Sequence, residues 1–534
     1  MKNFKEIFKK IVNHDHFLPF ILFTFIFTVY FSSSVGLMNS VDTPQFFTAE
    51  AILRNKNLDL SYFNNNPYYF IYPDVYYKDN QTLSFRGYLT SVLIIPFHLL
   101  ANLIKNFVKV DNFPNKIKSD YFNYQLTVVS LFTFFSASGL TFIFLSIKKI
   151  TKNRLMSLFL ILLLAFGTYI WKYAACYTRH GLTIFLLGFS ILSLLNYLES
   201  RSNHRRWLAV FLLLYSLSFG IDIFLFLSYS IFIFIFLILF HKEKIIDIKN
   251  FYIFLLPCIV IFFLILLNYY FYGTLFFNQN FLQPKIREVL GDKTAEALFS
   301  SPLLPVLKTV LFNNKKINES AFSNFNRYPQ RLLEFGSVEY AKKYMFYGLF
   351  FISPYLLIIF FIILFIKKIT RKKYISFILL FSFLIFFINL ILNSKILGFW
   401  GGNQYDVRYF YPYTVLLIFP AVFVLQEILK TKNKLIKIFF VFAFIISSIF
   451  SLIMGWLGVI NMYKPALTGE RRIWMEIYDL PNQFFNYSFK EYLDATFMNR
   501  ENFWIPIVLS FLFYLFYRLF VFLFYFLHHK KHRR

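Results

Sequence analysis

Residues 434–460 read KLIKIFFVFAFIISSIFSLIMGWLGVI, and no charged residue occurs between Ile438 and Ile460. An α-helix rises about 1.5 Å per residue, so about twenty apolar residues cross the hydrocarbon core of a bilayer, which is about 30 Å thick. Comparable apolar runs recur from one end of the chain to the other. These runs predict an all-α, polytopic membrane protein.

The composition agrees with this fold class. The chain has 534 residues, of which 58% are hydrophobic and only 15% are charged, whereas soluble globular proteins carry about 25% charged residues. The composition excludes a soluble enzyme, a coiled coil, a disulfide scaffold and a disordered protein. A lipid-facing β-barrel is also excluded, because its strands would alternate apolar and polar residues over segments of about ten residues.

The net charge of +28 comes from short clusters of lysine and arginine between the apolar runs. In a membrane protein such clusters mark topology, so we expect no nucleic-acid partner. The two cysteines, Cys176 and Cys258, are too few for a disulfide framework or a cysteine-based metal site. No sequence motif indicates a nucleotide, a metal or another cofactor.

The first apolar run follows a basic N-terminus and predicts an uncleaved helix that enters from the cytoplasm. With it, the apolar runs predict about twelve spans. Their expected positions are 17–31, 121–147, 155–171, 179–198, 207–220, 222–240, 251–272, 345–366, 374–393, 408–428, 434–460 and 503–527.

Segment 87–107 is apolar but contains Pro96 and His98 in mid-run and Lys105 near its end. If it lies on the membrane surface, all the basic loops share the cytoplasm with both termini, as the positive-inside rule requires. If it crosses, six of these loops move outside. The sequence therefore favours an interfacial or re-entrant helix on the outer face.

This topology predicts one membrane domain over residues 1–534, with short basic cytoplasmic loops and three long outer loops at 36–120, 273–344 and 461–502. Because functional residues concentrate in elaborated loops, we expect the site on the outer face.

The first outer loop contains Asp42, which precedes Thr43-Pro44 and a segment with apolar residues at helical spacing. One interpretation is that Asp42 caps this helix. The other is a general base at the membrane surface. Arg86, at the start of segment 87–107, is either a headgroup anchor or a phosphate contact.

The turn after span 155–171 carries Lys172, Arg179 and His180. Positive charge on the outer side opposes the inside rule, so these residues are either interface anchors or substrate contacts. Asp222 follows the next outer turn, where it either pairs with one of these cations or caps the helix 222–240.

The most specific local pattern is the connection Phe399–Pro412, which contains Gly401-Gly402 and Asp406 before Arg408-Tyr409. Paired glycines permit close backbone approach. Arg408 lies at the outer end of an apolar helix and needs an anion. Ligand phosphate, an ion pair with Asp406 and an interface anchor are the three interpretations.

Together these features resemble the C-type membrane glycosyltransferases (GT-C), which include the protein O-mannosyltransferases and the transferase that adds aminoarabinose to lipid A. The resemblance rests on the first helix, the loop that opens with Asp42, the surface helix after it and the shared sidedness of four motifs. These motifs are Phe166-Gly167-Thr168, Tyr272-Gly273-Thr274, Gly348–Pro354 and Trp400-Gly401-Gly402 with Arg408-Tyr409.

The resemblance implies an inverting transfer on the outer face of a bacterial plasma membrane. A sugar on a polyprenyl-phosphate donor would move to a glycan, lipid or protein acceptor. No cofactor and no metal-ligating residue is expected. Asp42 would activate the acceptor. Arg408 with Tyr409, and Lys172, Arg179, His180 or Arg86, would bind substrate and neutralise the departing phosphate.

One residue departs from the family pattern, because many relatives follow the aspartate with a second acidic residue and Thr43 stands there in this chain. Three other functions stay open. They are a flippase or transporter of lipid-linked sugar, an outer-face glycan ligase or polymerase, and a structural or assembly protein.

Overall fold

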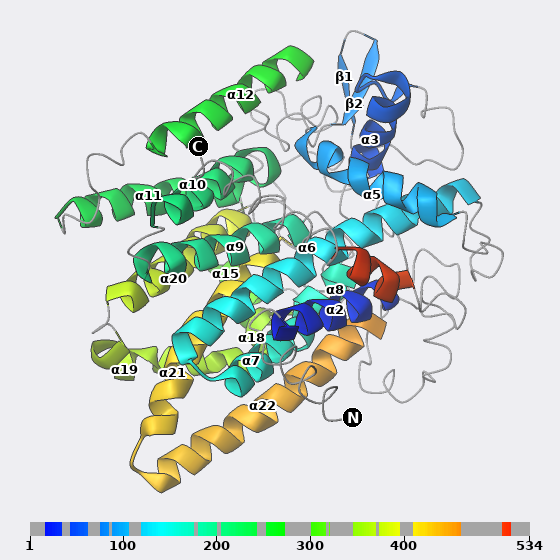
Figure 1. Cartoon of the computed structure of the whole chain (residues 1–534). Helices are drawn as coiled ribbons and strands as arrows, with labels where there is room; N and C mark the ends of the chain where they lie inside the picture. Colours follow the sequence, from blue (N-terminus) through cyan, green and yellow to red (C-terminus); the bar gives the residue numbers. More distant parts are fainter. Residues whose placement is uncertain are drawn as a thin grey trace, which may run out of the picture.

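The computed structural model describes residues 17–34, 43–61, 75–78, 80–84, 88–105, 119–175, 180–199, 204–242, 253–272, 301–316, 320, 345–369, 373–395, 409–460 and 505–513. The described chain is mainly helical (Figure 1). Its helices are α2 (Phe17–Ser32), α3 (Thr43–Asn55), α5 (Leu89–Lys105), α6 (Ser119–Thr151), α7 (Arg154–Phe166), α8 (Tyr169–Ala175), α9 (His180–Glu199), α10 (His204–Ile221), α11 (Ile223–Lys242), α12 (Leu255–Tyr272), α15 (Leu303–Phe312), α18 (Leu349–Ile352), α19 (Ile362–Ile369), α20 (Lys373–Lys395), α21 (Ile418–Lys430) and α22 (Lys434–Ile460). Two 3₁₀ segments, η7 (Pro354–Phe361) and η8 (Tyr411–Leu417), lead into α19 and α21.

Within the described residues, six helical segments are long and apolar enough to cross a membrane. They are Ser130–Thr151, His180–Glu199, Leu255–Tyr272, Tyr374–Lys395, Tyr411–Lys430 and Lys434–Val459. The predicted class, a helical membrane protein, is confirmed at this level. The count of about twelve spans stays a prediction.

Two predicted spans are not continuous helices. The run 155–171 is divided at Gly167-Thr168 into α7 and α8. The run 345–366 begins with strand β4 (Met345–Tyr347) and is divided by Ser353-Pro354 into α18, η7 and α19. Proline removes one backbone donor, and residues before it avoid the helical region, which explains the second break.

The centre of the bundle is the pair α6 and α9, which run parallel in close contact (Figure 1). Glycines make this approach possible. A Cβ at Gly139 would lie 2.6 Å from the carbonyl oxygen of Ile184, and one at Gly188 would overlap the carbonyl oxygen of Gly139. Small residues at such positions let membrane helices pack backbone to backbone.

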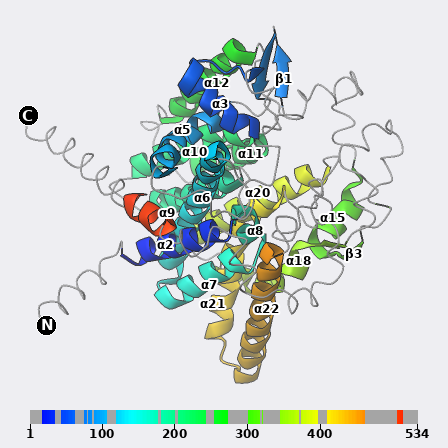
Figure 2. The ribbon, with the colours of Figure 1, turned by 90° about the vertical axis from the view of Figure 1, so that its right-hand side faces the viewer.

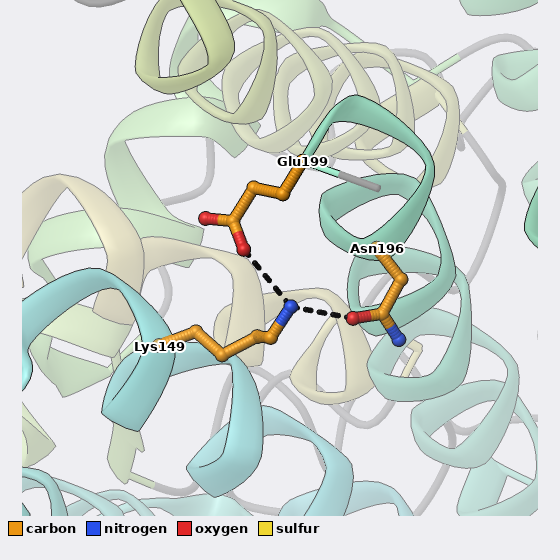
Figure 3. A network of polar contacts seen from close by, with 3 residues as sticks. All are labelled: Lys149, Asn196 and Glu199. Carbon is orange, nitrogen blue, oxygen red and sulfur yellow. Dashed lines mark hydrogen bonds and ion pairs between the residues drawn. The ribbon is translucent and has the colours of Figure 1, made fainter. Parts of the chain in front are cut away.

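The C-terminal ends of α6 and α9 are joined by a polar network (Figure 3). The ammonium of Lys149 donates to the side-chain oxygen of Asn196 at 2.6 Å and pairs with Glu199 at 2.9 Å. The basic segment 148–154 lies at this end of the bundle, so the positive-inside rule predicts that this end faces the cytoplasm.

Helix α3 packs on α5 and on strand β2 (Gln81–Ser84), the partner of β1 (Val75–Lys78), and α5 in turn packs on α6. Asp59 connects α3 to this hairpin, since its carboxylate accepts bonds from Ser61 and from the backbone N–H of Thr82 at 2.9 Å. Partial burial disfavours the charged form, but these bonds outweigh it and lower the pKa of Asp59. A second antiparallel pair joins β3 (Asn314–Lys316) to β4.

Figure 2 shows how the bundle is flanked on two sides. The helical residues 505–513 lie beside α2, where Phe513 contacts the rings of Phe27, Phe97 and Phe134. Helices α15 and α18 lie on the opposite side. The predicted span 503–527 is described only over 505–513.

Helix α5 confirms that segment 87–107 is helical over 17 residues. One face is buried, mainly on α3 and α6, and the other exposes the apolar side chains of Val92, Leu99 and Leu103. This arrangement fits a helix that borders lipid, and its interfacial position stays a prediction.

Sidedness can be measured directly. We expect a reporter that is active only outside the cell to be active after Lys116 and silent after Arg534, because 87–107 should not cross and both termini should face the cytoplasm. A cytoplasmic reporter at the same two positions is the control and should give the reverse pattern. An active outer reporter at Arg534 would contradict this topology.

Candidate functional site

Polar and aromatic side chains gather at the His180 end of α9, opposite the Lys149 network. A 20-residue helix is about 30 Å long, so the two ends lie about one membrane thickness apart. If the Lys149 end faces the cytoplasm, the His180 end faces outward. The site is built from α8, the start of α9, Asp222 between α10 and α11, and the residues that lead into η8.

The break between α7 and α8 sets the direction of α8. Gly167 ends α7 by donating its N–H to the carbonyl of Leu163 at 2.7 Å. Carbonyls freed by the break are satisfied by side chains, because Thr168 donates to Leu164 at 2.7 Å and Ser353 donates to Gly167 at 2.8 Å. A helix can be interrupted inside a membrane only when such groups find partners.

Two aromatic residues then fix α8 in place. The phenol of Tyr169 donates to the carbonyl of Tyr347 at 2.6 Å. The indole N–H of Trp171 donates to the hydroxyl of Ser33 at 2.9 Å, and its ring contacts Trp456. These contacts hold α8 between α2, α22 and strand β4, so the next residues, Lys172 and Tyr173, have a defined position.

A chain of ring contacts connects Lys172 to Tyr409. The ammonium of Lys172 lies 4.8 Å from the ring centre of Tyr173, which stacks on Tyr411 at 4.5 Å. The imidazole of His180 meets Tyr411 edge-on at 5.5 Å and Tyr409 at 6.4 Å. This set of five residues, the aromatic cluster, combines a buried cation, an imidazole and phenols.

The carboxylate of Asp222 binds to the same region. One oxygen of Asp222 accepts from the phenol of Tyr413 at 2.7 Å and from Thr183 at 3.1 Å. The other oxygen accepts the backbone N–H groups of Phe224 and Leu225 at 3.2 Å and so caps α11. Asp222 therefore fixes η8 against the first turn of α9.

Three of the predicted substrate-binding residues, Lys172, His180 and Tyr409, lie in the aromatic cluster. Lys172 is only 2% exposed, so its interpretation as an interface anchor that reaches water is wrong. Asp222 caps α11, which confirms one of its two interpretations. It also accepts hydrogen bonds from two hydroxyl groups.

The other predicted site residues, Asp42, Arg86, Arg179 and Arg408, lie outside the described residues. Their roles stay predictions. Arg179 and Arg408 immediately precede His180 and Tyr409 in the chain, so the cluster and these two arginines are covalent neighbours.

Sequence reasoning missed the contributions of Tyr173, Tyr411, Tyr413 and Thr183. The chain contains 37 tyrosines, so tyrosine alone gave no signal, and the stack of Tyr173 on Tyr411 joins residues far apart in sequence. Among the described residues, no group of three His, Cys, Asp or Glu side chains is arranged to hold a metal ion. This arrangement does not test whether the protein needs a metal.

Comparisons of the chain with protein-family models, with curated proteins and with solved structures find no match. Its function must therefore be inferred from its own residues.

Proposed function

We propose that the protein is a membrane glycosyltransferase that moves a sugar from a polyprenyl-phosphate donor to an acceptor on the outer face. The observation that carries this proposal is the aromatic cluster, where the stacked rings of Tyr173 and Tyr411 connect Lys172 to His180 at the helix end opposite the basic Lys149 network. It provides cationic and hydrogen-bonding groups at the level expected for a lipid phosphate.

The chemistry follows from the residues. Asp42 takes the proton of the acceptor hydroxyl or amine, whose oxygen or nitrogen attacks the anomeric carbon of the sugar. The bond between that carbon and the phosphate oxygen breaks, and the lipid phosphate leaves with an additional negative charge. Lys172, with Arg408 or Arg179 beside the cluster, stabilises that charge.

The aromatic residues support this assignment in a second way. The Tyr173–Tyr411 stack and the bonds of Asp222 order the cluster from several helices, so its cation is positioned before substrate arrives. Preorganised groups stabilise developing charge without reorganisation at the moment of reaction.

The direct test is transfer by the purified protein. Reconstituted in liposomes with undecaprenyl phosphate that carries a radiolabelled hexose, it should move label to envelope material from the source cells. Movement of the intact labelled lipid between leaflets, without transfer, would instead identify a flippase. Transfer of preassembled glycans but not of single sugars would identify a ligase or polymerase.

Lys172→Met is expected to weaken binding of undecaprenyl phosphate about 10- to 100-fold. A hydrogen bond to a charged group contributes about 1.5–3 kcal/mol, and about 1.4 kcal/mol changes affinity tenfold. Binding can be measured by native mass spectrometry in detergent.

Lys308→Met is the matched control, because Lys308 is an exposed lysine on α15 and should leave this affinity unchanged. If the Lys172 variant and the wild type bound undecaprenyl phosphate with equal affinity, Lys172 would not be a phosphate ligand.

A further inference from the structure

Gln45 occupies the first turn of α3 and is completely buried. Among the described residues, neither its side-chain nitrogen nor its side-chain oxygen has a hydrogen-bond partner. One turn later, Thr48 is equally buried but satisfied, since its hydroxyl donates to the carbonyl of Pro44 at 2.8 Å. Gln45 is thus a buried amide with no hydrogen-bond partner among the described residues.

Such an amide destabilises a protein unless something binds it, because both of its polar ends lose water on folding. The helix around it is firmly packed, since Phe46 and Phe47 are buried and Phe46 contacts the ring of His98 on α5. A methionine of similar length would fill the same space without the penalty. A partner from outside the chain explains why an amide stands there.

The position of Gln45 indicates where that partner lies. Side chains of a helix lean toward its N-terminus, so the amide of Gln45 is directed over the start of α3. The first backbone N–H groups of a helix have no intrahelical partners and add donors at this point. Asp42, the proposed base, stands directly before α3 in the chain.

The chemistry of Gln45 indicates what the partner is. An amide is uncharged and offers two donors and one acceptor, which matches hydroxyl groups, themselves donors and acceptors at once. A phosphate would offer acceptors only, and the buried cation is in the aromatic cluster. This chemistry favours the hydroxyl groups of a carbohydrate over a phosphate.

We infer that Gln45 is a specificity-determining residue that binds hydroxyl groups of the transferred sugar. This inference rests on the proposed function and deepens it.

The experiment uses Gln45→Met in the full-length protein, because glutamine and methionine have similar helix propensity. The probes are undecaprenyl phosphate alone and undecaprenyl phosphate carrying glucose, mannose or N-acetylglucosamine. Melting temperatures are measured without ligand, and affinities with each probe.

Without ligand, Gln45→Met should melt no lower than the wild type, because an unsatisfied amide has been removed. The wild type should bind one sugar-bearing lipid more tightly than the bare lipid. In the variant, this ratio of affinities should be about tenfold smaller. Thr48→Val is the matched control. It removes a satisfied hydroxyl, so it should lower the melting temperature and keep the preference for sugar.

Two results would overturn the inference while leaving the proposed function intact. One is a Gln45→Met protein that melts lower than the wild type, as Thr48→Val should, which would mean that the amide has an internal partner. The other is an unchanged preference for sugar in an active enzyme. A wild type that neither binds polyprenyl phosphate nor transfers sugar would overturn the proposed function and this inference together.

Discussion

Gly455→Ala is expected to destabilise the protein more than any other single methyl addition to α22. A Cβ at Gly455 would overlap the carbonyl oxygen of Phe166 and lie 3.5 Å from the Cα of Gly167. Both contacts are backbone at the break between α7 and α8, so no flexible side chain can move aside. Overpacking of this kind costs about 1–3 kcal/mol and sometimes more.

The consequence should reach the functional site, because α8 begins two residues after Gly167 and carries Lys172. We therefore expect a lower melting temperature in detergent, a smaller monodisperse fraction in size-exclusion chromatography and weaker binding of undecaprenyl phosphate. Gly455→Val should give little folded protein.

Ala443→Val is the matched control, since it also enlarges a small residue of α22 but on an exposed face. It should melt within about 1 °C of the wild type, because exposed substitutions away from special features usually change stability by less than about 0.5 kcal/mol. If Gly455→Ala melted like this control, the contact between α22 and the α7–α8 break would not be tight.

Most helices could be predicted from the sequence, because long apolar runs form helices in membrane proteins. The glycines did not indicate where a helix would break. Within the predicted span 155–171, Gly167 looked compatible with a continuous helix, since a single glycine is tolerated in helices. The break depends on Ser353 and on the approach of Gly455, which are distant in sequence. Only tertiary packing reveals these partners.

Part of the candidate site could also be predicted from the sequence. Lys172 and His180 were predictable because they flank one short turn on the outer side, where positive charge opposes the inside rule. Tyr411 stacks on Tyr173, and Tyr413 two residues later donates to Asp222, so both contacts join segments that are far apart in sequence. A local pattern does not contain that information. Gln45 could not be singled out either, because burial and missing partners are properties of the folded chain.

Asp42→Asn is expected to reduce sugar transfer about 10²- to 10⁴-fold, the contribution typical of a general base. Asparagine cannot take the acceptor's proton, but it caps a helix about as well as aspartate does. The start of α3, including Gln45 three residues later, should therefore stay in place. Transfer from an undecaprenyl-phosphate sugar and melting temperature in detergent are the two measurements.

Asp42→Ala separates the chemical role from the structural one. It should reduce the rate of sugar transfer as much as Asp42→Asn does. It should also lower helix stability by about 1 kcal/mol, because alanine cannot cap. Both variants should still bind undecaprenyl phosphate, since the proposed phosphate site is the aromatic cluster and not Asp42. If the asparagine variant transfers sugar normally while the alanine variant melts earlier, Asp42 is a helix cap alone. The proposed catalytic role of Asp42 would then fail.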